Sequence, residues 1–177
     1  MDTAFALFYR EGYHAVGIDK ILRTAGLAKM TLYHHFKSKE DLIVAVLERR
    51  GREISSRREQ ALKEAGTSPR KRLEALFIAY EAWFKSSGFS GCAFIRAIGE
   101  YPDAASPVHQ AATAVKRELI ATLTEILGDL KVQDPTRLAH QIYLLVEGAI
   151  VSAHTFSDPG AAAQARDAAL TLVAASR

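Results

Sequence analysis

The amino-acid sequence predicts an all-α fold. Apolar residues recur at spacings of three and four along the whole chain, which is the period of an amphipathic helix. No stretch rich in Val, Ile and Thr keeps the period of two that a half-buried strand shows. Gly and Pro residues fall between the periodic stretches, where they would end one helix and start the next.

Four helices are expected in the N-terminal part of the chain, over residues 2–11, 18–25, 29–35 and 38–65. Gly12 and Gly26 follow the first two helices, and glycine is common just after a helix, where the backbone turns left-handed. The fourth helix is expected to begin at Ser38, because Ser38-Lys39-Glu40-Asp41 resembles a capping box with Asp in place of the usual Glu.

Five more helices are expected in the remainder of the chain, over residues 69–85, 91–100, 108–127, 135–156 and 161–175. Pro69 and Pro135 suit the first helical position, where the missing N–H has no partner to lose. Asp158-Pro159-Gly160 separates the last two helices, the second of which is rich in alanine.

Composition excludes several classes of protein. Cys92 is the only cysteine, so it can form neither an intrachain disulfide nor a cysteine cage for a metal. A glycine-rich phosphate loop, G-x-S-x-G and H-E-x-x-H are all missing from the sequence, so we expect neither an enzyme nor a cofactor. Adjacent His34 and His35 point in different directions on a helix, which argues against a metal site. Without a signal sequence or an apolar run of about 18 residues, we expect no membrane contact and a cytoplasmic location.

Charge is distributed unevenly along the chain. The first 58 residues hold 11 Lys and Arg against 7 Asp and Glu, and the remaining residues hold 12 against 13. The net charge of +3 therefore comes from the N-terminal third. This distribution fits a protein whose N-terminal end meets phosphates.

Residues 18–35 have the pattern of a helix-turn-helix, in which two short helices are joined by a tight turn that contains glycine. The turn is Ala25-Gly26-Leu27-Ala28. Gly26 gives the backbone the freedom that the corner requires, and we expect Leu27 to fill the angle between the two helices. The second helix of such a motif enters the major groove of DNA.

The helix expected over residues 29–35 interleaves apolar anchors with hydrogen-bonding side chains. Leu32, His35 and Phe36 are expected to turn toward the core of the module, and the other side chains to face DNA. Lys39 lies at the start of the next helix, whose N-terminal backbone N–H groups attract phosphate. The residues expected to contact DNA are Lys29, Met30, Thr31, Tyr33, His34 and Lys39.

Several stretches of the first 50 residues resemble the DNA-binding signature of the TetR family of transcriptional regulators. These are Glu11-Gly12-Tyr13, residues 18–26, 31–36 and 38–40, and Leu42. The resemblance implies a three-helix DNA-binding domain over residues 1–45, which the fourth helix joins to a helical ligand-binding and dimerisation domain over residues 46–177. It also implies a homodimer, a palindromic double-stranded DNA operator, and repression that a small-molecule effector of unknown identity relieves.

The chain departs from the family pattern at three places. Val16-Gly17 stands where the family usually has hydroxyl residues that cap the second helix, so a weaker cap at Gly17 is expected. Ala28 replaces the common Ser at the entry to the third helix, which removes another cap. The first helix begins almost at Met1, so the usual N-terminal arm is short or missing from this numbering.

Aromatic residues of the C-terminal part are numerous enough to line a cavity as well as a core. Tyr143 and Glu147 are four residues apart on an otherwise apolar helix, so the carboxylate faces either solvent or a pocket. We expect a largely apolar effector between the helices of residues 69–156. The residues expected to bind it are Phe77, Tyr80, Glu81, Phe84, Tyr101, Tyr143 and Glu147.

The helices expected over residues 135–156 and 161–175 carry apolar and small residues on more than one side. Such helices need further cover, so these two are expected to form the homodimer interface. A monomer with a buried terminal hairpin is the alternative. A helical architectural or protein-binding module without effector control would also explain the helices, but not the run from Thr31 to Leu42.

Overall fold

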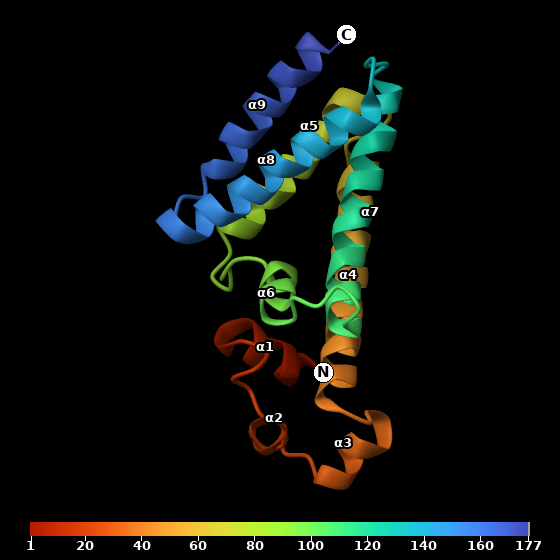
Figure 1. The fold of residues 1–177 in the computed structure, drawn as a ribbon. Helices are drawn as coiled ribbons and strands as arrows, with labels where there is room; N and C mark the ends of the chain where they lie inside the picture. Colours follow the sequence, from red (N-terminus) through yellow and green to blue (C-terminus); the bar gives the residue numbers. More distant parts are fainter. Residues whose placement is uncertain (177) are drawn as a thin grey trace. The chain divides into compact units, whose positions relative to one another are not determined.

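The computed structural model describes residues 1–176, and within them the chain forms nine α-helices and no strand (Figure 1). The helices are α1 (Asp2–Glu11), α2 (Ile18–Ala25), α3 (Lys29–His35), α4 (Lys39–Glu64), α5 (Pro69–Phe84), α6 (Ala93–Glu100), α7 (Pro107–Asp129), α8 (Pro135–Phe156) and α9 (Ala161–Ala175). The prediction of an all-α fold is confirmed, and every expected helix is present. Glycine and proline residues mark the helix ends where the sequence predicted them.

The chain divides into two compact units, which we call the N-terminal unit and the C-terminal unit. The N-terminal unit comprises residues 1–53 and 92–115, so α6 and the first part of α7 belong with α1–α3 and the start of α4. Its largest fully buried side chains include Phe8, Tyr13 and Ile43. The core of this unit is therefore built from α1, the segment after it, and α4.

The C-terminal unit comprises residues 54–91 and the described residues from 116 onward. Within it α8 packs against both α9 and α5, and α9 packs against α5. Leu73, Leu123 and Ile142, from α5, α7 and α8, are fully buried. The expected division of the chain at residue 45 stays a prediction, because these units are defined by contacts and not by independent folding.

The helix starts follow the expected capping chemistry. Asp134 Oδ1 accepts a hydrogen bond from the N–H of Arg137 at 3.0 Å, and Pro135 occupies the first turn of α8. Gly17 and Ala28 precede α2 and α3 without a side-chain cap, as the departures from the family pattern predicted. In the described part of the chain, no helix combines the length and the hydropathy that a membrane crossing requires.

Candidate nucleic-acid interface

Helices α2 and α3 meet at the tight turn of residues 25–28. Gly26 ends α2 in the left-handed conformation, with φ 65° and ψ 33°, which glycine adopts at little cost. The N–H of Leu27 donates to the carbonyl of Leu22 at 3.0 Å. The side chain of Leu27 is 49% exposed, so the expectation that it fills the angle between the helices is wrong. Leu22 and Leu32 are the buried leucines of these two helices.

Helix α3 buries Leu32 and presents the opposite side to solvent. Met30 is 83% exposed and Tyr33 is 46% exposed, and large side chains left open in this way mark a contact surface. The residues of α3 that were expected to contact DNA, and that are exposed, are Lys29, Met30, Thr31, Tyr33 and His34. The last four of these surround a shallow, open hollow. We call these five residues the recognition surface.

His35 is exposed, so the expectation that it turns toward the core is wrong. Helix α3 has only seven residues, and the backbone leaves the helical conformation at Phe36, with φ −133° and ψ 124°. Phe36 is half-buried at this point, whereas His35 occupies the last helical position outside the core. The ring of His35 stands edge-on to that of His34, with 5.2 Å between their centres.

Lys29 is the recognition-surface residue with a charged neighbour. Its Nζ lies 3.7 Å from Oδ1 of Asp19, and the two side chains are 64% and 84% exposed. An exposed ion pair of this kind contributes at most about 1 kcal/mol. Lys29 can therefore leave Asp19 for a base edge or a phosphate at little cost.

The start of α4 forms a second part of the interface. Ser38 Oγ accepts a hydrogen bond from the N–H of Asp41 at 3.0 Å, and Oδ2 of Asp41 accepts one from the N–H of Lys37 at 3.1 Å. This confirms the predicted cap at Ser38. Nζ of Lys39 donates to the carbonyl oxygen of His14 at 3.2 Å. The ammonium of Lys39 is thus held beside the turn between α1 and α2, at a helix end that favours anions.

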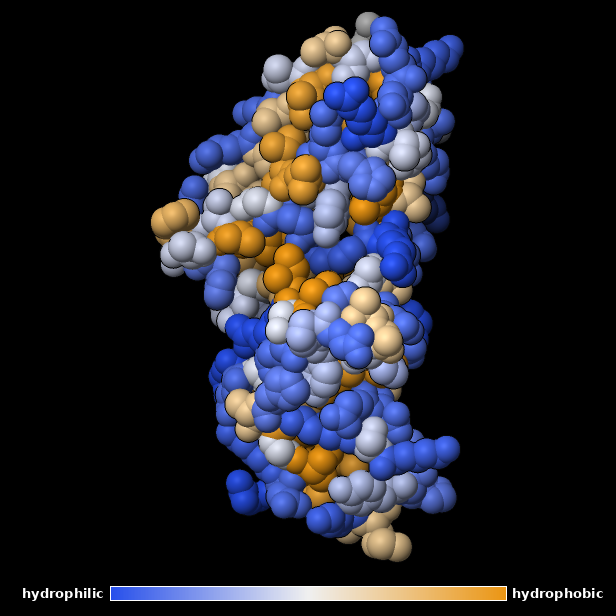
Figure 2. Space-filling model, in the orientation of Figure 1, coloured by the Kyte–Doolittle hydropathy of each residue, from blue (hydrophilic) through white to orange (hydrophobic). Residues whose placement is uncertain are grey.

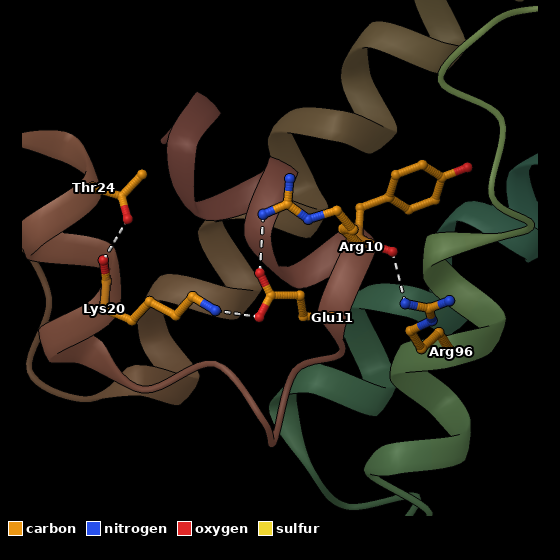
Figure 3. Close-up of polar contacts among 6 residues, drawn as sticks. Arg10, Glu11, Lys20, Thr24 and Arg96 are labelled. Carbon is orange, nitrogen blue, oxygen red and sulfur yellow. Dashed lines mark hydrogen bonds and ion pairs between the residues drawn. The ribbon is translucent and has the colours of Figure 1, made fainter.

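Glu11 links α1 to α2 through ion pairs that Figure 3 shows. Its carboxylate accepts a hydrogen bond from Arg10 at 3.0 Å and another from Lys20. These hydrogen bonds, that from Lys20 first, hold the pKa of the Glu11 carboxyl below its ordinary value. Arg10 and Lys20 are therefore both paired with the carboxylate of Glu11.

Helix α6 supplies residues that the sequence analysis missed. The hydroxyl of Tyr13 donates to the carbonyl of Ala93 at 3.1 Å. The guanidinium of Arg96 donates to the carbonyl of Tyr9 at 2.7 Å, a contact that Figure 3 shows. Burial raises the pKa of the Tyr13 phenol, so its hydroxyl stays protonated and remains a donor. The end of α1 and the segment after it are thereby held by a helix that lies 80 or more residues later in the chain.

Glu100, the last residue of α6, binds the turn that follows α1. Its Oε1 accepts a hydrogen bond from the N–H of Tyr13 at 3.0 Å, and its Oε2 accepts one from the N–H of His14 at 2.6 Å. In return, Nε2 of His14 donates to the backbone carbonyl of Glu100 at 2.7 Å. No local pattern in the sequence reveals this contact, because its two sides lie 86 residues apart.

The residues expected to bind an effector fall in both units. Tyr101 belongs to the N-terminal unit, where its ring stacks on that of His14 with 4.6 Å between centres. Phe77 and Phe84 are 2% and 7% exposed, whereas Glu81 lies at the surface in an ion pair with Lys85. The six effector candidates of the C-terminal unit are Phe77, Tyr80, Glu81, Phe84, Tyr143 and Glu147.

Aromatic rings gather around the end of α5. The ring of Phe89 lies 5.0 Å from that of Trp83 and 5.0 Å from that of Phe84, centre to centre. Tyr80 extends this group, with its ring centre 6.1 Å from that of Phe84. The C-terminal unit therefore contains a cluster of aromatic rings that pack against one another at interplanar angles of 44° to 86°.

Glu147 lies inside the C-terminal unit with a partner that the sequence analysis missed. Its Oε1 accepts a hydrogen bond from Nζ of Lys116 at 2.6 Å, and the two side chains are 13% and 11% exposed. Its Oε2 is buried and has no hydrogen-bond partner. The carboxylate therefore faces the interior and not solvent, and one of its oxygens remains without a hydrogen-bond donor.

Helix α8 also carries exposed apolar side chains. Leu144 is 68% exposed and Val151 is 54% exposed, and a separation of seven residues places them on one face of a helix. Figure 2 shows apolar patches over the region of α8 and α9 among largely hydrophilic neighbours. Exposed apolar side chains grouped in this way mark an interaction surface.

Two family models match the chain. One, described as bacterial regulatory proteins of the tetR family, covers residues 1–46. The other, described as a tetracyclin repressor-like C-terminal domain, covers residues 69–169. Their boundaries include the recognition surface in the first match and the Lys116–Glu147 pair in the second.

The chain is similar to characterised regulators and to solved structures. A TetR-family transcriptional regulator from Streptomyces coelicolor has 32% identity and a TM-score of 0.92, over 99% of this chain and 92% of that one. The transcriptional activator FasR of Mycolicibacterium smegmatis is 44% identical over 82 residues, which span 46% of this chain but only 36% of that relative. The transcriptional repressor NemR of Escherichia coli is 28% identical, over 85% of this chain and 80% of the relative.

Proposed function

The chain belongs to the TetR family of bacterial transcriptional regulators, and we propose that it is a homodimeric repressor that a small effector releases from a palindromic operator. It is a DNA-binding regulator and not an enzyme. Because operators lie on the bacterial chromosome, the proposal places the protein in the cytoplasm.

The observation that carries the proposal is the recognition surface. Helix α3 is anchored by Leu32, while Met30, Tyr33 and their neighbours stand open to solvent. In this arrangement Lys29 and Thr31 read base edges in the major groove, since a lysine donates to guanine and a threonine methyl contacts thymine. Tyr33 and Lys39 bind phosphates and set the position of the helix, and Met30 and His34 complete the contact.

The proposed dimer uses α8 and α9. Leu144 and Val151 lie on one face of α8, where a second copy of the same face would cover them. A two-fold interface of this kind pairs each patch with itself. A two-fold protein requires a two-fold operator, with half-sites about one helical turn of DNA apart or a multiple of that spacing.

The proposed effector binds in the C-terminal unit. In the proposed site the buried rings of Phe77 and Phe84, together with Tyr80, would supply apolar and aromatic contacts, and Oε2 of Glu147 would supply one buried acceptor. A largely apolar molecule that carries a hydroxyl or amine would satisfy both. Such a ligand relieves repression only if it prefers the conformation whose recognition helices no longer match the operator spacing. We propose that α4, which runs from Lys39 to Glu64, transmits the effect of the bound ligand to the DNA-binding helices.

Repression is proposed rather than activation because an effector that loosens DNA binding acts most simply on a repressor. The similar proteins include both kinds, as the names of FasR and NemR show. A reporter gene placed downstream of the bound site distinguishes a repressor from an activator. Deletion of this regulator should raise expression of the reporter if it is a repressor, and lower it if it is an activator.

The proposal is tested by recovering genomic DNA on the purified protein and sequencing what is bound. A recovered palindrome should bind far more tightly than a scrambled duplex of the same composition, at about 10³-fold or more for a specific regulator. Equal affinity for the palindrome and the scrambled duplex would contradict a sequence-specific repressor. That result would leave an architectural helical module.

A further inference from the structure

We propose that Glu100 is a positioning residue of the DNA-binding surface: through the turn at residues 12–14, it fixes the place of the Lys39 ammonium. The inference rests on the proposed function in one respect, namely that Lys39 binds a DNA phosphate. All the residues involved belong to the N-terminal unit. Glu100 itself would not touch DNA in this account.

The first step is the close fit between Glu100 and the turn. The carboxylate accepts hydrogen bonds from two consecutive backbone N–H groups, those of Tyr13 and His14. Gly12 has φ +98°, and a Cβ added to it would lie 3.0 Å from Oε1 of Glu100. A glycine at this position therefore serves two purposes: it adopts the positive φ at little cost, and it leaves room for the carboxylate of Glu100 to approach the backbone. Hydrogen bonds to a charged acceptor are stronger than those between neutral groups, so the carboxylate holds the turn of residues 12–14 in one position against the end of α6.

The second step is the return contact from His14. A backbone carbonyl can only accept, so Nε2 of His14 carries the hydrogen in the 2.7 Å contact with the carbonyl of Glu100. The ring of His14 stacks on that of Tyr101, the residue after Glu100. Nδ1 of His109 in turn donates to the carbonyl of Tyr101 at 2.9 Å, which ties this end of α6 to α7.

The third step leads from His14 to the DNA side. The same residue whose N–H is held by Glu100 uses its carbonyl to accept a hydrogen bond from Nζ of Lys39 at 3.2 Å. An ammonium has three hydrogens, so this contact orients Lys39 and leaves donors for a phosphate. A flexible lysine that is held in this way loses less entropy when it binds DNA. If the turn moves, the carbonyl that holds Lys39 moves with it.

The test is a double-mutant cycle on DNA affinity, which uses Glu100→Gln, Lys39→Ala and the double variant in the full-length protein. Both carboxylate oxygens of Glu100 accept a backbone N–H, but a glutamine side chain has one oxygen and one NH₂ group. The NH₂ group cannot accept, so Glu100→Gln loses one of the two hydrogen bonds. Glu100→Gln should weaken binding to the recovered genomic site about three- to tenfold. In the Lys39→Ala background the same substitution should change affinity by less than about twofold.

The matched control is Glu118→Gln. Glu118 also accepts two hydrogen bonds, from Ser55 and Arg58, but these residues belong to the C-terminal unit. Glu118→Gln should leave DNA affinity unchanged both in the parent and in the Lys39→Ala background. Thermal unfolding of each variant shows whether it is folded at the assay temperature. The cycle compares the effect of Glu100→Gln in the parent and in the Lys39→Ala variant, so a loss of stability that Glu100→Gln causes in both proteins cancels.

The outcomes separate this inference from the function on which it rests. If Lys39→Ala alone leaves affinity and its salt dependence unchanged, the DNA contact assigned to Lys39 is wrong. If Lys39→Ala weakens binding but the effects of the two substitutions on binding free energy add, Glu100 does not act through Lys39 and the inference is overturned. If Glu100→Gln remains folded and binds DNA as the parent does, the inference is likewise overturned.

Discussion

Nζ of Lys116 lies 2.6 Å from Oε1 of Glu147, and both side chains are almost removed from solvent. The pair joins α7 to α8 within the C-terminal unit. Removing two charges from water is costly, and their attraction offsets that cost only while both are present. The second carboxylate oxygen of Glu147 is buried without a hydrogen bond, so the pair leaves one polar atom unsatisfied. A site that retains such an atom is a reasonable place for a ligand to bind.

The ion pair predicts an asymmetry between single and double substitutions. Lys116→Met leaves the carboxylate of Glu147 without this cation, so it should lower the free energy of unfolding by about 3 kcal/mol. Adding Glu147→Leu should restore most of the loss, because the charge left behind is replaced by apolar volume. Urea denaturation of the three variants measures both steps. If the double variant is less stable than either single variant, the pair is not the buried charge pair described here.

Parts of this arrangement were readable in the sequence. Glu147 interrupts an otherwise apolar helix, which makes it a candidate pocket residue in the sequence, and the structure places it inside the unit. Lys116 could have been found by the same reasoning, since Ala112, Leu119 and Leu123 place it on the buried stripe of α7. Both residues break a helical pattern, and such breaks are visible in one sequence.

Other parts had no local signal. Nothing near Glu100 in the sequence indicates that it binds the N–H groups of residues 13 and 14, because tertiary structure alone brings them together. The sequence predicts that His35 turns toward the core together with Leu32 and Phe36. The helix ends there, however, and its last side chain stands outside the core. Side-chain direction at the end of a short helix depends on where the chain goes next.

Substitutions in the interface should distinguish residues that position the protein on the DNA backbone from residues that recognise the base sequence. Tyr33→Phe and Lys39→Ala remove phosphate contacts, so both should weaken binding to all duplexes, and Lys39→Ala should also reduce the salt slope by about 1 because it removes a cation. Lys29→Ala and Thr31→Ala should instead change the preference between bases, by about 1–3 kcal/mol per contact. Titration of each variant against the recovered site and single-base variants of it, at several salt concentrations, measures both effects.

The matched control for this series is Arg70→Ala. Arg70 pairs with Glu74 on the surface of the C-terminal unit, where no DNA contact is proposed. It removes one positive charge, as Lys39→Ala does. Unchanged binding by all four interface variants would mean that α3 is not the recognition helix.

The proposed dimer predicts the effect of a charge on α8. Leu144→Glu places a carboxylate on an exposed apolar face, where it would meet its symmetry mate or be buried without a partner. The variant should sediment as a monomer at concentrations where the parent is a dimer, and should lose most of its operator affinity. Leu27→Glu is a control for the sedimentation measurement alone, because Leu27 is also exposed and belongs to the N-terminal unit. Its DNA affinity is not compared, because Leu27 lies in the turn between α2 and α3 and a carboxylate there would itself repel DNA. A Leu144→Glu variant that remains dimeric would exclude this face of α8 from the interface.

The buried phenol of Tyr13 predicts a loss of stability in alkali. Burial raises the pKa of Tyr13 in the folded protein, whereas the unfolded chain releases this proton near the ordinary value of 10.0. The folded state then binds more protons, so the free energy of unfolding falls as the pH rises above about 10. Tyr13→Phe should cost about 1 kcal/mol at neutral pH, through the lost hydrogen bond to Ala93. It should also flatten the decline above pH 10, and an unchanged decline in urea melts from pH 8 to 11 would contradict the burial of this hydroxyl.

The effector proposal predicts reciprocity between the two binding sites. A compound identified by its stabilisation of the protein in a thermal-shift screen of small aromatic amines and alcohols should weaken operator binding. By linkage, saturating operator must weaken the binding of that compound by the same factor. A hundredfold effect corresponds to about 2.7 kcal/mol of preference for the released conformation.

Glu147→Gln tests the polar anchor of the same site. The substitution keeps the size of the side chain but exchanges the unpartnered acceptor for an amide, so it should weaken compound binding. It also removes the charge that pairs with Lys116 and so lowers stability, and operator affinity is compared at a temperature where thermal unfolding shows the variant to be folded. Phe77→Ala is a poorer probe, because Phe77 is only 2% exposed and its truncation would cost about 3–5 kcal/mol of stability. Isothermal titration of the compound into free and operator-bound protein measures the coupling for the parent and for Glu147→Gln. Equal affinity of the compound for free and operator-bound parent would mean that the protein is controlled in some other way, because a ligand without differential affinity cannot shift the equilibrium between the two conformations.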